Sequence, residues 1–179
     1  VASSWDNGLW YQDGATLDWV LLDGSPASRL TAGDVTGDGR VELIGTWTNG
    51  IWYYDFAASP PAWTQMTAEV TTGDIAAGDF TGDGKADVAS TWSSGLWYQD
   101  GETLAWTQLP GDAPSKVTAG DVTGDGRDEI IGTWSNGIWY RDVAASDWTK
   151  MAGGLPDGDI AAGDFTGDGK ADVASIWPS

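Results

Sequence analysis

The 179-residue sequence contains no cysteine and no histidine, and these absences remove several kinds of chemistry. Without cysteine, the chain has no disulfide framework and no thiolate that could attack a substrate or bind a metal. Without histidine, it lacks the usual general base and the commonest ligand of transition metals. No distinct serine or lysine constellation takes their place. The sequence therefore predicts a protein that is not an enzyme.

Basic residues are also scarce, since 8 lysines and arginines stand against 27 aspartates and glutamates, for a formal net charge of −19. Nucleic acids and anionic membrane surfaces select basic patches, so we expect neither as a partner. There is no apolar run long enough to span a membrane, and we expect no membrane insertion. The absence of a signal-peptide pattern at Val1 favours a mature or trimmed chain, and we expect a secreted, extracellular protein.

Acidic residues are concentrated in four short loops. Asp-Phe-Thr-Gly-Asp-Gly-Lys-Ala-Asp occupies residues 79–87 and 164–172, and Asp-Val-Thr-Gly-Asp-Gly-Arg-x-Glu occupies residues 34–42 and 121–129. Hard cations such as calcium take six to eight oxygen ligands, and glycine lets a short loop fold back around one. The pattern predicts about one structural Ca²⁺ per loop. The alternative is a set of Asp-Gly turns that happen to be acidic.

The loops recur at intervals of 45, 42 and 43 residues, a period typical of propellers and solenoids. Each repeat contains short runs of Val, Ile, Thr, Trp and Tyr bounded by turn residues, and no helical pattern. In the repeat 73–115 we expect strands at about 74–79, 87–92, 96–100 and 104–109. The sequence therefore predicts an all-β fold, a β-propeller of about four four-stranded antiparallel blades.

We expect a single repeat domain over residues 1–179. It comprises a partial repeat at 1–29, full repeats at 30–72, 73–115 and 116–158, and a partial repeat at 159–179. The predicted 17 strands are one more than four closed blades need. We expect either a ring closed by mixing the N- and C-terminal strands, or assembly between chains as a homo-oligomer.

A turn signal joins the second and third strand of each repeat. If Asn49 and Gly50 are the two turn residues, Trp47 lies directly opposite Trp52. The same count predicts the pairs Trp5–Trp10, Trp92–Trp97 and Trp134–Trp139. Charges also alternate at the start of the first strands, with Arg29 and Lys116 in one repeat type and Asp74 and Asp159 in the other. These charges either pair between blades or are unconnected surface charges.

The acidic loops resemble the calcium loop of FG-GAP/VCBS-type repeats, which occur in the propeller head of integrin α chains, in secreted bacterial proteins and in some propeller lectins. The resemblance implies calcium bound by side chains at loop positions 1, 5 and 9 and by the carbonyl at position 7. The threonine at position 3, where the family often has Asp or Asn, is a weaker ligand and implies lower affinity. The implied metal-site residues are Asp34, Thr36, Asp38, Arg40, Glu42, Asp79, Thr81, Asp83, Lys85, Asp87, Asp121, Thr123, Asp125, Arg127, Glu129, Asp164, Thr166, Asp168, Lys170 and Asp172.

The tryptophans suggest aromatic platforms for sugar rings, and the resemblance to propeller lectins supports that interpretation. We expect Trp47, Trp92 and Trp134 to serve packing, whereas the third-strand aromatics are the ligand candidates. Fourth-strand tryptophans, namely Trp19, Trp63, Trp106 and Trp148, are alternative platforms or edge protection. The ligand candidates are Trp10, Tyr11, Trp52, Tyr53, Trp97, Tyr98, Trp139 and Tyr140, each pair followed by an aspartate: Asp13, Asp55, Asp100 and Asp142.

The prediction is therefore a calcium-stabilised, non-catalytic binding module with lectin-like recognition of a glycan. Two alternatives remain. One is a protein-interaction or adhesion propeller, and the other is a purely structural repeat fragment of a larger secreted protein.

Overall fold

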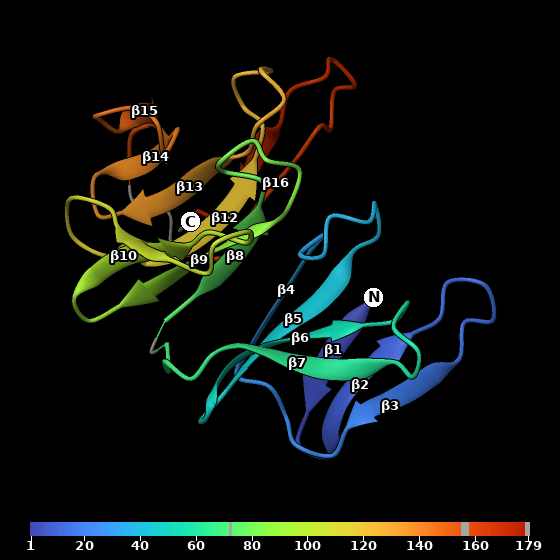
Figure 1. Ribbon diagram of the computed structural model, residues 1–179. Helices are drawn as coiled ribbons and strands as arrows, with labels where there is room; N and C mark the ends of the chain where they lie inside the picture. The colour runs from blue at the N-terminus through green and yellow to red at the C-terminus, as the bar shows by residue number, and fades with distance from the viewer. Residues whose placement is uncertain (72, 155–157, 178–179) are drawn as a thin grey trace. The chain divides into compact units, whose positions relative to one another are not determined.

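The computed structural model describes residues 1–71, 73–154 and 158–177 (Figure 1). These residues form 17 β-strands, as predicted, and every sheet is antiparallel. No helix able to cross a membrane is present among them. Three short segments of the predicted repeats, at residues 72, 155–157 and 178–179, lie outside the described residues.

The chain divides into two compact units, which are described separately. Unit 1 comprises Val1–Ala32 with Val41–Thr71, and unit 2 comprises Gly33–Arg40 with Thr72–Ser179. Unit 1 carries two sheets, each with its strands in chain order. Sheet I consists of β1 (Ala2–Trp5), β2 (Gly8–Gln12) and β3 (Trp19–Asp23). Sheet II consists of β4 (Arg29–Gly33), β5 (Glu42–Trp47), β6 (Gly50–Asp55) and β7 (Ala62–Thr67).

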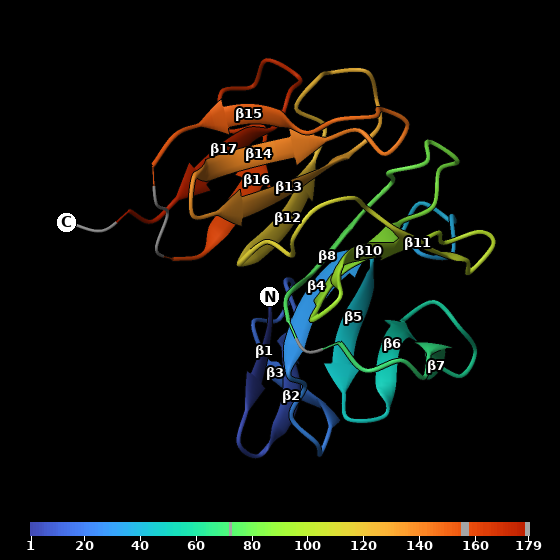
Figure 2. The same cartoon turned by 90° about the vertical axis from the view of Figure 1, so that its left-hand side faces the viewer.

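Unit 2 carries three sheets of the same design. Sheet III consists of β8 (Ile75–Gly78), β9 (Asp87–Trp92), β10 (Gly95–Gln99) and β11 (Trp106–Gln108). Sheet IV consists of β12 (Lys116–Gly120), β13 (Glu129–Trp134), β14 (Gly137–Arg141) and β15 (Thr149–Ala152), which follow one another across the sheet in Figure 2. Sheet V consists of β16 (Ile160–Gly163) and β17 (Asp172–Ser175). The three four-stranded sheets confirm the predicted repeat unit.

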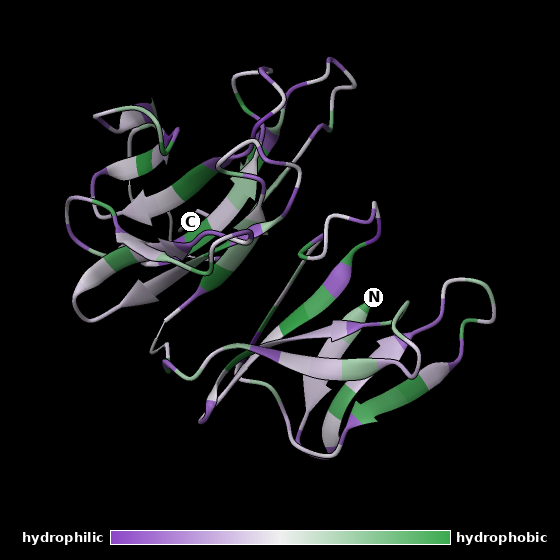
Figure 3. Ribbon diagram, in the orientation of Figure 1, coloured by the Kyte–Doolittle hydropathy of each residue, from purple (hydrophilic) through white to green (hydrophobic). Residues whose placement is uncertain are grey.

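The second strand of each four-stranded sheet is apolar on both faces, because it lies inside the unit. In β13, the neighbouring residues Ile130 and Ile131 point to opposite faces and are both fully buried. In β5, Ile44 is equally buried. Figure 3 shows hydrophobic residues concentrated along β5 and β13.

The core of unit 2 lies between sheets III and IV. Phe80, from the acidic loop before β9, is fully buried and packs in one cluster with Leu96, Val117 and Ile130. The first strands of the sheets meet nearby, with β12 beside both β8 and β16 (Figure 1). Burying a phenylalanine side chain such as that of Phe80 stabilises the fold by roughly 1.5–3 kcal/mol.

The predicted hairpin register is wrong, because the turn lies one residue earlier than expected and the strand pairing therefore shifts by two residues. Trp47 lies opposite Gly50 rather than Trp52, so Thr48 and Asn49 form the turn and Gly50 begins β6. Gly50 has a φ of +127°, and a Cβ there would lie 2.0 Å from the carbonyl oxygen of Thr67. Glycine is therefore required where the next strand approaches, not inside the turn. The other hairpins share this register: Trp5 opposite Gly8, Trp92 opposite Gly95, and Trp134 opposite Gly137.

One of the expected charge pairs is confirmed. The ammonium group of Lys116, which starts β12, forms an ion pair with the carboxylate of Asp159, just before β16. The other acidic position is also engaged at β12, because Asp74 Oδ2 accepts a hydrogen bond from the backbone N–H of Val117 at 3.2 Å. Exposed pairs of this kind contribute little to stability, typically about 0–1 kcal/mol. They connect the first strands of neighbouring sheets.

Candidate functional site

Three tryptophans gather on one face of sheet II. Strand alternation puts Trp47 of β5 and Trp52 of β6 on the same face, since Trp47 pairs with Gly50 and Trp52 stands two residues further on. Trp63 of β7 joins them because it pairs with Tyr54 on that face. The rings of Trp47 and Trp63 lie 4.9 Å apart, nearly edge to face. Sheet IV repeats the arrangement, with 4.8 Å between the rings of Trp134 and Trp148.

Each of these aromatic faces is hollowed into a pocket. In sheet IV the pocket has a volume of about 340 Å³, near the lower end of the range for small-molecule sites. It is lined by Pro110, Gly111, Asp112, Trp134, Ser135, Asn136, Trp139 and Trp148. In sheet II the pocket has a volume of about 230 Å³ and is lined by Asp23, Ser25, Trp47, Asn49, Trp52 and Trp63. Both pockets combine three tryptophans, the turn asparagine and the loop that precedes the sheet.

Hydrogen bonds hold the rings of the sheet IV pocket in place. The indole N–H of Trp134 donates to the carbonyl oxygen of Asp112 at 2.9 Å, and that of Trp139 donates to Asn136 Oδ1 at 3.0 Å. The indole N–H of Trp148 donates to the carbonyl oxygen of Pro110 at 3.3 Å. The indole N–H groups of the three rings are thus hydrogen-bonded to the walls, and the parts of the rings that line the pocket offer apolar contact to a ligand.

The chemistry of these pockets suits a flat, partly apolar ligand that carries hydroxyl or amide groups. The tryptophans are half-buried, so part of each ring is exposed and can make apolar contact with a ligand. One aspartate lines each pocket: Asp112 in the sheet IV pocket, and Asp23, the last residue of β3, in the sheet II pocket. Lys150 adds a cation at 5.2 Å from the ring centre of Trp139.

The predicted ligand residues separate into two groups. Trp52 and Trp139 line the pockets, and Trp10 and Trp97 occupy the same position in sheets I and III. The tyrosines that follow them lie on the opposite face of each sheet because side chains alternate. The ring of Tyr98, for example, packs edge to face on Phe80 of the core, with 6.3 Å between the ring centroids. The remaining tyrosines of this set are Tyr11, Tyr53 and Tyr140.

The aspartates two residues after these tyrosines serve the turns that follow. Asp100 Oδ1 accepts hydrogen bonds from the backbone N–H groups of Glu102 and Thr103, at 3.0 and 2.7 Å. Asp13 and Asp55 likewise accept hydrogen bonds from the backbone N–H groups two and three residues later in the chain. Asp142 accepts one from the backbone N–H of Ala144. Their role here is to fix the turn before the fourth strand.

Sequence reasoning assigned Trp47 and Trp134 to packing, and the structure places both in pocket walls as well as in ring contacts. It also did not single out the wall residues Asp23 and Asp112. The signal available in the sequence is the glycine two residues before each of the two tryptophans, where the other repeats have serine.

The acidic loops form a separate feature with one shared backbone design. The first aspartate accepts hydrogen bonds from the backbone N–H groups three, four and five residues later, as Asp121 does at 2.6, 3.1 and 2.8 Å. The aspartate at position 5 accepts from the N–H at position 7, as Asp125 does from Arg127 at 3.0 Å. The loops beginning at Asp34, Asp79 and Asp164 follow the same scheme.

The two loop types differ in how their carboxylates converge. Carboxylate oxygens of Asp121, Asp125 and Glu129 all lie within 4.8 Å of one another. In the Asp79–Asp87 loop, the shorter Asp87 is held by backbone N–H groups of Thr81 and Gly101, and the described carboxylates do not converge in this way. Among the other predicted metal residues, Asp34, Thr36, Asp38 and Arg40 belong to unit 2, while Glu42 begins β5 of unit 1.

Burial raises the pKa of two of the ninth-position acids, Asp87 and Glu129. Burial raises the pKa of the Asp87 carboxyl to about 6, although hydrogen bonds from Gly101 and Thr81 act in the opposite direction. Burial also raises the pKa of Glu129. At the exposed position 5, the hydrogen bond from the Arg127 side chain lowers the pKa of Asp125. A bound cation would therefore stabilise the charged form of these two buried carboxylates more than that of the exposed ones.

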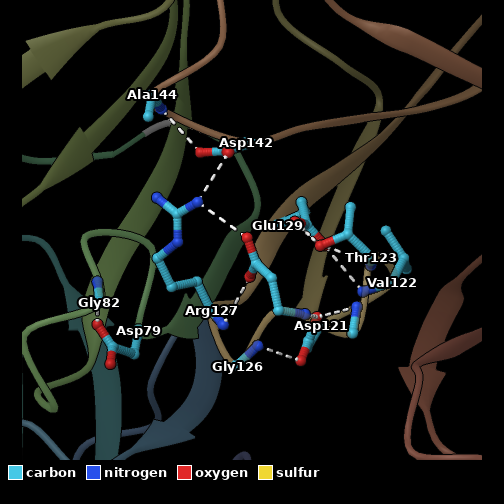
Figure 4. A network of polar contacts seen from close by, with 12 residues as sticks. Asp79, Gly82, Asp121, Val122, Thr123, Gly126, Arg127, Glu129, Asp142 and Ala144 are labelled. Carbon is cyan, nitrogen blue, oxygen red and sulfur yellow. Dashed lines mark hydrogen bonds and ion pairs between the residues drawn. The ribbon is translucent and has the colours of Figure 1, made fainter.

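The loops are also joined to one another by backbone hydrogen bonds. The N–H at loop position 8 donates to the carbonyl oxygen at position 1 of the preceding loop. The bonds run from Ala86 to Asp34 at 2.7 Å, from Asp128 to Asp79 at 3.0 Å and from Ala171 to Asp121 at 2.7 Å. Arg127 bridges locally, binding the carboxylates of Asp125 at 2.9 Å and Asp142 at 3.1 Å (Figure 4).

Comparisons with known proteins give a structural likeness only. No family model matches the chain, and no curated protein matches it. A solved structure of an Agrocybe aegerita lectin, described as showing specific recognition of non-reducing terminal N-acetylglucosamine, is similar to 94% of this chain with a TM-score of 0.63 and 17% identity. The match covers 55% of that lectin, so the chain spans about half its length. At this identity the likeness shows a shared all-β fold.

Proposed function

We propose that this chain is a non-catalytic, propeller-type carbohydrate-binding module that acts outside the cell, with its sugar sites in the pockets of sheets II and IV. The observation that carries the proposal is the recurrence of one pocket design, three tryptophans with a turn asparagine, in two repeats. Packing alone requires no such hollow. The likeness to a lectin that recognises terminal N-acetylglucosamine supports the same ligand class.

The pocket geometry indicates how a sugar would be held. The ring faces of Trp139 and Trp148 would contact the apolar C–H face of a pyranose, while Asp112 and Asn136 would receive its hydroxyl and amide groups. Because hydrogen bonds from the indole N–H groups already fix the rings, little side-chain entropy would be lost on binding. Two weak sites on one chain would gain strength on a multivalent glycan surface.

The acidic loops are proposed to hold calcium, in line with their resemblance to FG-GAP/VCBS repeats. The donor set fits a hard cation, since the Asp121–Glu129 loop gathers three carboxylates. In the Asp79–Asp87 loop, the buried Thr81 hydroxyl oxygen has no hydrogen-bond partner, as expected of an atom that faces an ion. When bound, calcium would neutralise clustered carboxylates and pin the turn between the first and second strands.

Isothermal titration of the full chain with N-acetylglucosamine tests the sugar proposal, with a terminal N-acetylglucosamine glycan surface for multivalent binding. Trp139→Ala should abolish binding at the sheet IV pocket, a loss of at least about tenfold in affinity, or 1.4 kcal/mol. Tyr140→Phe is the matched control, because the neighbouring side chain lies on the opposite face.

If the folded wild-type chain binds neither the sugar nor a wider glycan array, the lectin proposal is wrong. A protein ligand that survives Trp139→Ala would then favour the adhesion alternative.

A further inference from the structure

The same three-tryptophan set takes two arrangements, and the residue two positions before the second-strand tryptophan separates them. In sheets II and IV that residue is a glycine, Gly45 or Gly132. In sheets I and III it is a serine, Ser3 or Ser90. We call these pairs the glycine sheets and the serine sheets.

In the glycine sheets the tryptophan ring lies back over the glycine. A Cβ at Gly132 would lie 2.6 Å from Cη2 and Cζ3 of Trp134, and a Cβ at Gly45 would lie equally close to Trp47. Real side chains do not approach so closely, so any other residue would displace the ring. The far edge of each ring is anchored to the loop before the sheet, where the indole N–H donates to a carbonyl oxygen: Asp112 for Trp134 and Ser25 for Trp47.

In the serine sheets the ring takes a different position. The indole N–H of Trp92 donates to the hydroxyl of Ser90 at 2.7 Å, within its own strand. The ring then stacks on Trp97, with 6.0 Å between centroids and 29° between planes. In sheet I, Trp5 lies 6.0 Å from Trp10 at 37°. Among the described residues, no such ring pair joins Trp47 to Trp52 or Trp134 to Trp139.

The two positions have opposite effects on the third-strand tryptophan. Where the second-strand ring stacks on it, one face of that tryptophan is covered by protein. Where the second-strand ring lies back over glycine, the space between the rings is the pocket, and the third-strand tryptophan lines it. The second- and third-strand rings thus form a pair in the two sheets that have serine at this position and line a pocket in the two that have glycine.

We infer that Gly45 and Gly132 are positioning residues that open the sugar pockets, so that alternate sheets bind ligand and the serine sheets do not. This inference rests on the proposed function and makes it more specific. The ligand is a saccharide with an N-acetylhexosamine-sized terminal ring, and a chain carries about two sites, one in each glycine sheet.

Titration of the full chain with N-acetylglucosamine gives the number of sites directly. The wild type should bind about two sugars per chain, Gly132→Ser about one, and the double variant with Gly45→Ser none. Gly14→Ser is the matched control, because Gly14 has ordinary φ and a Cβ there meets nothing within 4 Å. An unchanged number of sites in folded Gly132→Ser would overturn the inference and leave the proposed function standing.

A second measurement does not depend on sugar. Stacked indoles give an exciton couplet in circular dichroism, so Gly132→Ser should strengthen it by driving Trp134 towards Trp139. Ser90→Gly should weaken the couplet by releasing Trp92 from Trp97, and this variant removes bulk rather than adding it. If Gly132→Ser fails to fold, an unchanged couplet in Ser90→Gly overturns the inference. If the wild type binds no sugar, the proposed function fails while these spectra still decide how the rings are positioned.

Discussion

The glycine sheets and the serine sheets use the same strands, the same hairpin register and the same three tryptophans, and yet their rings are arranged differently. In the serine sheets the second- and fourth-strand rings meet at 50–57°, and in the glycine sheets at 70–80°. The acidic loops follow the same alternation, since they end on Asp87 at the start of β9 in sheet III and on Glu129 at the start of β13 in sheet IV. A repeat can thus keep the same three tryptophans and still differ between its copies in whether the rings stack on one another or line a pocket.

The largest expected effect concerns the packing role of sheet III. Phe80→Ala should lower the free energy of unfolding by about 3–5 kcal/mol, because it empties a fully buried position between sheets III and IV. Chemical denaturation followed by tryptophan fluorescence would measure the loss. Phe165 occupies the same loop position in the last repeat and is 62% exposed, so Phe165→Ala should be nearly neutral. Equal losses in the two variants would contradict this assignment of the core.

A smaller effect should distinguish the two loop types in calcium binding. Glu129→Gln keeps the shape of the side chain but removes one of three converging carboxylates, so it should weaken calcium at that loop by about tenfold, or 1.4 kcal/mol. Asp87→Asn should weaken it less, since the described carboxylates of the Asp79–Asp87 loop do not converge as those of the Asp121–Glu129 loop do.

Calcium titration and thermal unfolding with and without a chelator would measure both variants. A melting temperature that does not respond to the chelator in the wild type would remove calcium from the description of this protein.

A further expected effect is a pH dependence of the stability of the metal-free chain. Because burial raises the pKa of Asp87 to about 6, the folded state binds this proton more tightly than the unfolded state, whose pKa is near 3.8. The resulting stabilisation is complete below pH 3.8 and is lost as the pH rises through about 6. Urea unfolding in calcium-free buffer should show this decline, and Asp87→Asn should remove it. The same slope in both proteins would show that another group is responsible.

The sequence predicted the features that depend on local chemistry. Four acidic loops, the strand-rich repeats between them and the number of strands all follow from turn residues and β-branched or aromatic runs. In the repeat 73–115 the observed strands are 75–78, 87–92, 95–99 and 106–108, within two residues of prediction at each end. These features are set by residues close together in the chain.

The features that were missed depend on residues far apart. The hairpin register could not be predicted because the carbonyl of Thr67, on another strand, is what requires glycine at position 50. The pocket walls were missed for a similar reason, since Asp112 meets Trp134 only after sheet IV has formed beside its linking loop. Loop convergence depends on the single methylene by which Glu129 is longer than Asp87.

The bonds between successive acidic loops have a consequence for how such a chain can change in evolution. Each loop is joined through its eighth residue to the one before it, so every copy presents the next with an identical attachment point. A duplicated or deleted repeat therefore meets the neighbour it already fits, and the array can grow or shrink by whole units without redesign of the rest. Sequence changes can then accumulate elsewhere, at positions such as 90 and 132, where exchanging serine and glycine would create or remove a proposed sugar pocket.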